Sequence, residues 1–256
     1  MLAARSLLFN VLFYANLIAW SLAIVPTLVM PRKAIIRAAQ AWARSNLWLM
    51  RATVGTTVEF RGLERIPPGG LLVAAKHHSF WETFALATLF DDPVFILKRE
   101  LMWIPFFGWY LWKAGMIPVN RKKGSLALVE MNRRARQEVR RGRQILIFPE
   151  GTRRPPGAEP AYKFGIAHLY ANFGVPCLPV ALNSGLFWPR RRFLRRPGTI
   201  VVEILAPLAP GLPRDQFFQE VRDRIETASQ RLLREGRAQL GLPQVDEAMA
   251  PDRPSV

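Results

Sequence analysis

The chain has 256 residues, enough for one sizeable α/β domain with a full core. Its 36 Lys and Arg against 19 Asp and Glu give a net charge of +17, which predicts an anionic partner: nucleic acid, an anionic membrane surface or a phosphorylated substrate. A single cysteine, Cys177, excludes an intrachain disulfide and a zinc site built from cysteines, and we expect no metal and no other cofactor.

The chain begins with an apolar segment that has no charged residue from position 6 to position 30. Since about 20 helical residues cross the core of a bilayer, this segment is long enough to do so. A cleavable signal peptide is an alternative, but the segment is long for one and no small-residue cleavage site follows it cleanly. Pro26 and Pro31 interrupt a straight helix.

Residues 32–51 predict a basic amphipathic helix suited to the headgroup boundary of an anionic membrane. Its apolar stripe is Ile35, Ile36, Ala39, Trp42, Ala43, Leu47 and Met50, while Arg37, Gln40, Arg44 and Arg51 lie largely off it. Residues 1–51 would anchor the protein, either as a span followed by an interfacial helix or as a two-helix hairpin in one leaflet. The excess of Lys and Arg after the apolar segment predicts an inner membrane location with the main domain on the cytoplasmic side.

Beyond residue 52, apolar segments alternate with helical ones, which predicts an α/β fold: a mostly parallel sheet covered by helices, after the N-terminal membrane-associated helices. The predicted strands are residues 57–61, 71–75, 94–97, 116–119, 144–148, 178–182 and 199–204, and the predicted helices are 81–90, 125–141, 161–172 and 215–235. We expect one domain over 52–240 and a disordered tail over 241–256. Ligands of such sheets bind at the carboxyl ends of strands.

One predicted strand is followed by His77 and, after four intervening residues, by Glu82. Across a strand-to-helix turn, a carboxylate can accept a hydrogen bond from one imidazole nitrogen and leave the other free to take a proton from a hydroxyl. Alternatively, Glu82 only caps a helix, because Ser79 and Glu82 have the spacing of a capping box. His78 is a competing base, but no carboxylate lies five residues beyond it.

Four blocks in order resemble the glycerolipid acyltransferases, most closely the lysophosphatidic acid acyltransferases (1-acyl-glycerol-3-phosphate acyltransferases). They are the His77/Glu82 pair, GMIPVNR at 115–121, FPEGTR at 148–153 and VPCLPV at 175–180. A single block would be a weak signal, but four in order between about residues 71 and 182 are a strong one. The family most often has Asp where this chain has Glu82, which leaves the lysolipid subclass open.

The resemblance implies transfer of an acyl chain from acyl-CoA or acyl carrier protein to the free hydroxyl of 1-acyl-glycerol-3-phosphate, giving phosphatidic acid. His77 would be the general base and Glu82 its partner, with no covalent acyl-enzyme. The sequence agrees, because it contains no Gly-x-Ser-x-Gly elbow. Another lysolipid acceptor, such as an amino-acid-headed one, remains an alternative. A basic, membrane-associated nucleic-acid-binding protein is a remote one, and we expect no nucleic acid partner because no recognition motif is evident.

The resemblance also implies the acceptor site. Arg153 would hold the phosphate with help from Arg121, because a guanidinium matches phosphate geometry with two hydrogen bonds. Arg121 is alternatively a solvated cation. Glu150 would orient the acceptor or a neighbouring cation, Gly151 would let the backbone approach the ligand, and Thr152 belongs to the same block.

Two further segments are unusual. Residues 101–113 are very apolar for a connection between strands, and they either cover an acyl-chain tunnel, lie in the membrane or form a buried helix. Residues 190–196 contain five arginines around Phe193 and Leu194. We expect this basic loop to contact a lipid surface, with a merely solvated loop as the alternative.

Overall fold

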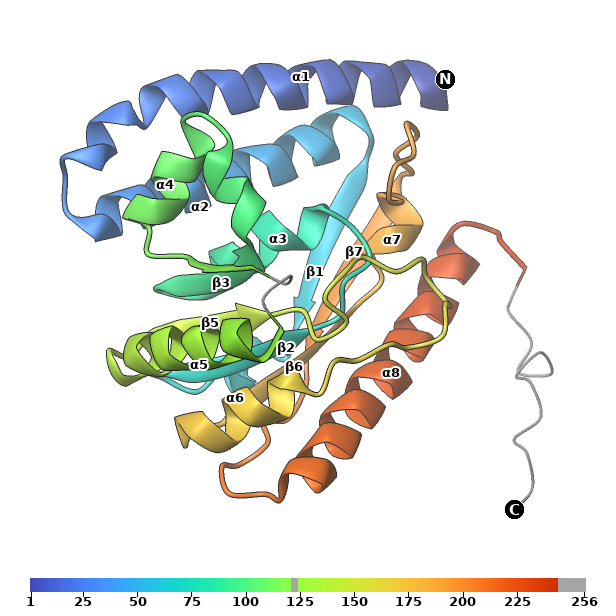
Figure 1. The fold of residues 1–256 in the computed structure, drawn as a ribbon. Helices are drawn as coiled ribbons and strands as arrows, with labels where there is room; N and C mark the ends of the chain where they lie inside the picture. The colour runs from blue at the N-terminus through green and yellow to red at the C-terminus, as the bar shows by residue number, and fades with distance from the viewer. Residues whose placement is uncertain (121–123, 244–256) are drawn as a thin grey trace.

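A seven-stranded sheet forms the centre of the computed structural model, which describes residues 1–120 and 124–243 (Figure 1). Its strands are β1 (Thr56–Arg61), β2 (Leu71–Ala75), β3 (Pro93–Lys98), β4 (Ile117–Val119), β5 (Gln144–Ile147), β6 (Cys177–Leu182) and β7 (Gly198–Ile204). They lie in the order β1-β7-β6-β2-β5-β3-β4, and every neighbouring pair is parallel except β6 and β7. The predicted fold class is confirmed, and each predicted strand agrees with the structure to within one residue at either end.

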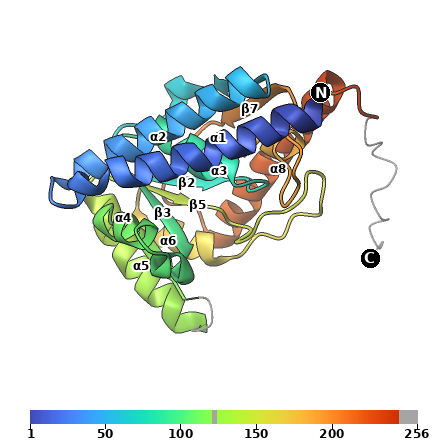
Figure 2. The ribbon, with the colours of Figure 1, turned by 90° about the horizontal axis from the view of Figure 1, so that it is seen from above.

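Helices cover both faces of the sheet (Figures 1 and 2). The α-helices are α1 (Leu2–Ala23), α2 (Arg32–Thr53), α3 (Trp81–Ala85), α4 (Phe107–Lys113), α5 (Gly124–Arg140), α6 (Gly165–Phe173), α7 (Ser184–Phe187) and α8 (Arg214–Gln239). Shorter 3-10 helices are Val25–Leu28, Leu63–Arg65, Leu86–Leu89 and Arg99–Trp103. One core joins the sheet to α1, α2, α3 and α7, and a second core on the other face joins it to α5, α6 and α8.

The sequence of the central strand β2 is apolar throughout and does not alternate between apolar and polar residues. All five of its residues are buried, because Leu71 and Val73 point into the first core and Leu72 and Ala74 into the second. A strand that is buried on both faces therefore has an unbroken series of apolar residues. Cys177 at the start of β6 is also fully buried.

The helices α1 and α2 form an antiparallel hairpin over the first core (Figure 2). The chain turns back between them in the segment that contains Pro26 and Pro31, where proline disfavours a continuous helix. Phe9 and Phe13 of α1 are buried in the core. The opposite side of α1 exposes Leu7, Leu8, Val11, Tyr14, Ile18 and Leu22. Among the described residues, α1 is the one helix long and apolar enough to cross a membrane, judged by length and composition.

The helix α2 departs from its predicted role in one respect. Much of its apolar side, including Ile35, Ala43 and Met50, is buried against protein rather than facing lipid. Gln40, predicted to lie off the stripe, is also buried, and its amide donates hydrogen bonds to the backbone carbonyls of Ala87 and Phe90. The amphipathic pattern correctly predicts the helix, but it does not identify whether protein or lipid covers the apolar face.

The apolar connection at 101–113 is not a buried core helix. Trp103, Trp109 and Trp112 are 68%, 54% and 74% exposed, and Phe106 and Phe107 are also exposed. These side chains extend the apolar surface beyond α1. The tail predicted to be disordered falls mostly on residues 244–256, outside the described part of the chain.

Candidate active site

The candidate site residues gather where three neighbouring strands end. His77 follows β2, Phe148 follows β5, and Ser184 begins α7 after β6. Because β2 pairs in parallel with both β5 and β6, their carboxyl ends share one edge of the sheet. Ligand sites of open α/β sheets lie at this edge.

His77 and Glu82 are in direct contact, with 3.0 Å between His77 Nδ1 and Glu82 Oε1. An ionised carboxylate only accepts hydrogen bonds, so this contact assigns the proton to Nδ1 and leaves Nε2 with a free lone pair. Glu82 is fully buried. Burial opposes ionisation of the carboxyl, but hydrogen bonds from His77, the Ser79 backbone and Ser184 outweigh it and lower its pKa.

Glu82 also forms the hydrogen bonds of a capping box with Ser79, in the turn that precedes α3, so the two interpretations of this residue are compatible. Its Oε1 accepts hydrogen bonds from the backbone N–H groups of His78 and Ser79, both at 2.6 Å. The hydroxyl of Ser184 donates to Oε2 at 2.7 Å. The Ser79 hydroxyl in turn accepts from the Trp81 N–H at 3.1 Å. These bonds hold the carboxylate in one position beneath the imidazole.

The imidazole of His77 is held on its flat face as well. Phe148 stacks on it with ring centroids 3.9 Å apart and planes inclined by 15°. The backbone N–H of Arg154 donates to the His77 carbonyl at 2.9 Å. The His77 side chain is 13% exposed, so the ring is fixed in position yet reaches the surface of the site.

His78 is a poor candidate for the base. Its ring is buried, and neither ring nitrogen has a hydrogen-bond partner among the described residues. Burial lowers the pKa of His78 to about 4, so the imidazole is neutral at pH 7. Gly185 packs against it so closely that a Cβ there would lie 2.8 Å from His78 Cβ. The geometry favours His77.

Several guanidinium groups gather beside this pair. Arg190 Nη1 donates to the Arg153 backbone carbonyl at 2.8 Å. Burial lowers the pKa of Arg153, and the positive charges of Arg190 and Arg191 lower it further. Such a group of cations is a ready site for an anion. Part of the predicted lipid-binding loop therefore turns toward the site, and Arg195 is largely buried, with its guanidinium 4.6 Å from the Trp188 ring centroid.

Glu150 takes part in a buried charge network. Lys76 Nζ lies 3.1 Å from Glu150 Oε1 and 2.7 Å from Glu226 Oε1, and the Tyr162 hydroxyl donates to the same Glu226 oxygen at 2.8 Å. Lys76 and Glu150 are both almost inaccessible to solvent. Of the two predicted roles for Glu150, the structure shows contact with a neighbouring cation. This network links the end of β2, the loop after β5 and α8.

Three predicted site residues remain: Gly151, Thr152 and Arg121. Gly151 has a φ of +67°, which favours glycine, whereas an added Cβ would meet only Lys163 Cγ at 3.9 Å. Its left-handed turn, rather than lack of space, thus explains the glycine. Thr152 is exposed. Arg121 lies outside the described residues. Within residues 1–120 and 124–243, no group of three His, Cys, Asp or Glu side chains is arranged to hold a metal ion.

Comparison with known proteins identifies the family. An acyltransferase family model matches residues 57–183. A 1-acyl-sn-glycerol-3-phosphate acyltransferase of Pseudomonas aeruginosa is 39% identical over 206 residues, which cover 79% of each chain. The chain belongs to the acyltransferase family.

Another relative and a solved structure also resemble this acyltransferase, each over a different share of its length. A mouse 1-acyl-sn-glycerol-3-phosphate acyltransferase alpha is 31% identical over 166 residues, covering 63% of this chain and 58% of the relative. The crystal structure of the 1-acyl-sn-glycerophosphate acyltransferase PlsC from Thermotoga maritima aligns with a TM-score of 0.75 and 22% identity. The alignment covers 91% of this chain and 99% of the other, so the two share a fold over most of their length.

Some contacts of the acyltransferase site had no sequence signal. Ser184 lies 102 positions after Glu82, and Glu226 lies 150 positions after Lys76. Neither separation in sequence follows a local period. The order of the strands brings Ser184 to Glu82, and the packing of α8 on β6 brings Glu226 to Lys76. Phe148 belongs to a block used in the prediction, but its stacking on His77 was not predicted. The position of Arg190 was missed as well, although the loop itself was singled out.

Proposed function

We propose that this acyltransferase transfers a fatty acyl chain from a thioester to the free hydroxyl of 1-acyl-glycerol-3-phosphate and so forms phosphatidic acid. The observation that carries the proposal is the His77/Glu82 contact at the strand-end edge, next to the cations around Arg153. The printed names of the bacterial and mouse relatives support the same acceptor.

In the proposed reaction His77 acts as general base. Nε2 takes the proton of the acceptor hydroxyl while the oxygen attacks the thioester carbonyl carbon, and the carbon–sulfur bond then breaks. The proton leaves His77 for the departing thiolate, so the products are the ester and the free thiol. Glu82, which hydrogen-bonds Nδ1, orients the ring and stabilises the imidazolium that forms in between.

The acceptor phosphate would bind at Arg153. The pKa of this guanidinium is lowered first by burial and then by the nearby charges of Arg190 and Arg191. A phosphate would reverse the repulsion among the three cations and accept paired hydrogen bonds. Arg121, two positions after the end of β4 in the sequence, is proposed to assist. This arrangement favours a phosphate-bearing lysolipid over one with an amino-acid head.

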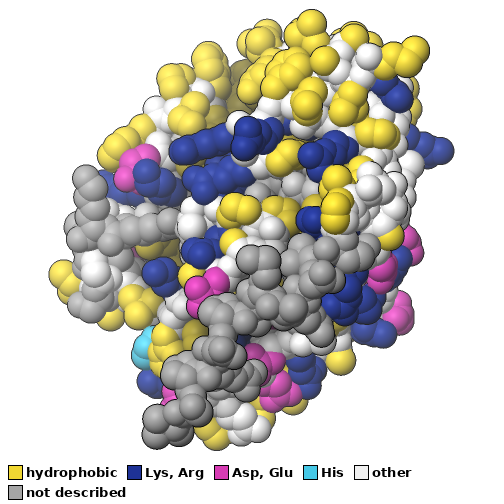
Figure 3. Space-filling model, turned by 90° about the vertical axis from the view of Figure 1, so that its right-hand side faces the viewer, with side chains coloured by type: hydrophobic (Ala, Val, Ile, Leu, Met, Phe, Trp, Pro, Cys, Tyr) yellow, Lys and Arg dark blue, Asp and Glu magenta, His cyan; other side chains and the backbone are white. Residues whose placement is uncertain are grey.

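We further propose that α1 and α2 lie in one leaflet rather than span the bilayer. Contacts along α1 support the hairpin: Arg5 Nε donates to the Thr53 carbonyl at 2.7 Å, and the Asn16 amide donates to Ser45 Oγ at 2.9 Å. A span would break them. Figure 3 shows hydrophobic side chains gathered at the top, with a band of Lys and Arg below, as suits lipid tails above and anionic headgroups beneath. The catalytic domain would then lie on the cytoplasmic side.

The acceptor is tested with the purified protein in detergent, one labelled acyl thioester and a panel of lysolipids. The panel holds lysophosphatidic acid, lysophosphatidylcholine, a lyso-amino-acid lipid and phosphate-free monoacylglycerol. We expect labelled phosphatidic acid from lysophosphatidic acid and much slower acylation of the others. Preferential acylation of the amino-acid lipid would overturn the proposed acceptor while leaving acyl transfer intact.

A further inference from the structure

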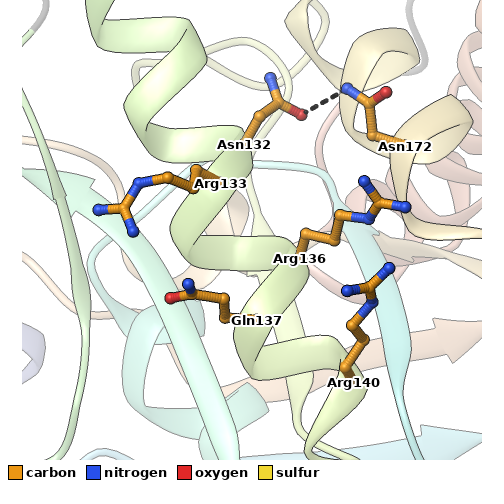
Figure 4. A pocket seen from close by; sticks show the side chains of 6 residues that line it. All are labelled: Asn132, Arg133, Arg136, Gln137, Arg140 and Asn172. Atoms are coloured by element: carbon orange, nitrogen blue, oxygen red, sulfur yellow. Dashed lines mark hydrogen bonds between the residues drawn. The ribbon is translucent and has the colours of Figure 1, made fainter.

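A basic groove lies between α5 and α6 (Figure 4). These two helices are on the face of the sheet opposite the apolar hairpin (Figure 1). The groove has a volume of about 380 Å³, and it is lined by Asn132, Arg133, Arg136, Gln137, Arg140 and Asn172. Only Asn172 comes from α6, and its amide donates to Asn132 at 3.2 Å across the groove. Since α1 and α2 cover the other face, this groove would open to water when the hairpin rests on a membrane.

The arginines of the groove lie on one side of α5, at spacings of three and four residues. Arg133 is paired with Glu130 at 2.9 Å. Arg136 and Arg140 have no hydrogen-bond or ion-pair partner in the part of the chain that the structure describes, and both are exposed. Figure 4 shows their guanidinium groups on the same side of the helix, toward Asn172. Like charges one turn apart repel, so an anionic partner is favoured here.

The helix α5 connects the groove to the edge of the sheet that holds the active site. The helix α5 begins shortly after β4, which ends at the same edge of the sheet as β5 and β2. From there it runs away from that edge, and Arg136 and Arg140 lie 12 and 16 positions beyond Gly124, which corresponds to about 18 Å and about 24 Å of helix. A partner that docks on α5 therefore needs a long, flexible arm to bring an acyl group to His77.

We propose that this groove docks an acidic acyl carrier protein, whose phosphopantetheine arm delivers the acyl thioester to His77. The proposal rests on the proposed acyl transfer and adds the identity of the donor. The carboxylates of a carrier helix would meet Arg136 and Arg140, and the net charge of +17 would steer the acidic protein toward the enzyme. The acyl group then leaves the pantetheine sulfur for the acceptor oxygen, and the carrier departs as a free thiol.

The groove fits a protein helix better than the nucleotide of acyl-CoA. None of its six lining residues is aromatic, so an adenine would have no ring to stack on. From Arg133 to Arg140 the arginines extend over about 10 Å of helix, which matches carboxylates spaced along a second helix. An acyl-CoA nucleotide would use the phosphate contacts alone.

The test compares two donors on one enzyme. The variant is Arg136→Glu/Arg140→Glu. The matched control is Arg134→Glu/Arg141→Glu, which makes the same change of charge outside the groove, on α5 and at the residue that follows it. The Arg134 pair with Glu130 is exposed, so its loss costs little, and Glu138 keeps its ion pair with Arg143 when Arg141 is replaced. Each protein is assayed with palmitoyl-loaded acyl carrier protein and with palmitoyl-CoA at low and high salt. Binding of the carrier alone is measured by surface plasmon resonance.

We expect the groove variant to raise the KM for the acylated carrier by at least about tenfold at low salt, since charge pairs at an interface mainly speed association. The KM of the groove variant for palmitoyl-CoA stays unchanged, and so do both KM values of the control variant. Binding of the carrier to the groove variant weakens in parallel. An equal rise for both donors would assign the groove to the nucleotide of CoA and overturn the proposal. A wild type that neither binds nor uses the carrier would overturn it too. If neither donor supports turnover, the proposed function fails, and the binding measurement still decides the docking surface.

Discussion

Replacing Glu82 by Gln removes a buried charge and keeps the shape of the side chain. Three hydrogen bonds reach Oε1, from His77 Nδ1 and from the backbone N–H groups of His78 and Ser79. The carbonyl oxygen of Gln can accept all three. The Ser184 hydroxyl, which donates to Oε2, can rotate and accept from the new amide instead. We therefore expect the variant to fold with His77 in its native position.

The loss is expected in the chemical step. When His77 takes the proton of the hydroxyl it becomes an imidazolium, which a carboxylate stabilises better than an amide. A hydrogen bond involving a charged group contributes about 1.5–3 kcal/mol, against about 0.5–1.5 kcal/mol for a neutral one, a difference of about 1–2 kcal/mol. Since about 1.4 kcal/mol is a factor of ten, kcat falls about 5- to 30-fold. The KM for the acceptor changes little, because Glu82 is fully buried.

The assay is the initial rate of phosphatidic acid formation at saturating thioester, with lysophosphatidic acid varied. Glu64→Gln is the matched control, because the Glu64 side chain is 75% exposed and lies on the surface after β1. Thermal unfolding of each variant checks the fold. A wild-type kcat in a folded Glu82→Gln variant would refute the reasoning and leave Glu82 as a helix cap alone.

Three further predictions concern charge and proton binding. The pKa of His78 is lowered from 6.5 to about 4, so unfolded chains bind more protons, and the free energy of unfolding falls by about 3 kcal/mol as pH drops from 6.5 to 4. His78→Leu should flatten this fall in denaturant titrations, and an unchanged slope would contradict the assignment. Arg153→Gln should raise the KM for lysophosphatidic acid about ten- to a hundredfold. The KM for phosphate-free monoacylglycerol should stay the same, and an equal rise for both would argue against a phosphate contact. Lys76→Met leaves Glu150 and Glu226 without their cation, so it should destabilise the fold by about 3–5 kcal/mol, measured by denaturant unfolding. Lys76→Met/Glu150→Gln should recover part of that loss, and a single-variant loss below about 1 kcal/mol would show that the network is not strongly coupled.

Much of the fold could be predicted because its sequence signals are local. The continuous apolar run of β2 reflects burial on both faces, and the spacing of His77 and Glu82 suits a turn between strand and helix. The same spacing allowed a helix cap, and the structure shows why that alternative was hard to separate. One carboxylate oxygen bonds both the imidazole and two backbone N–H groups of the turn that precedes α3.

The parts that could not be predicted depend on contacts between distant segments. The apolar stripe of α2 gives a helix with one apolar face, but its partner is protein because α2 packs on the sheet layer and α3. Lys76 lies directly before His77, and its local sequence does not distinguish it from other lysines. Its partners Glu150 and Glu226 reach it only because β5 pairs with β2 and α8 packs across the neighbouring strand.

The most direct test of the account is a comparison of the wild type with His77→Asn and His77→Ala. An Asn amide can still donate to Glu82, so the first variant keeps that hydrogen bond and removes only the nitrogen that takes the proton. The measurement is the rate of labelled phosphatidic acid formation from lysophosphatidic acid and an acyl thioester, on protein whose fold is verified. The account predicts that both variants lose about 10²- to 10⁴-fold in kcat, the usual contribution of a general base. Wild-type rates in both would contradict it, because acyl transfer would then proceed without His77.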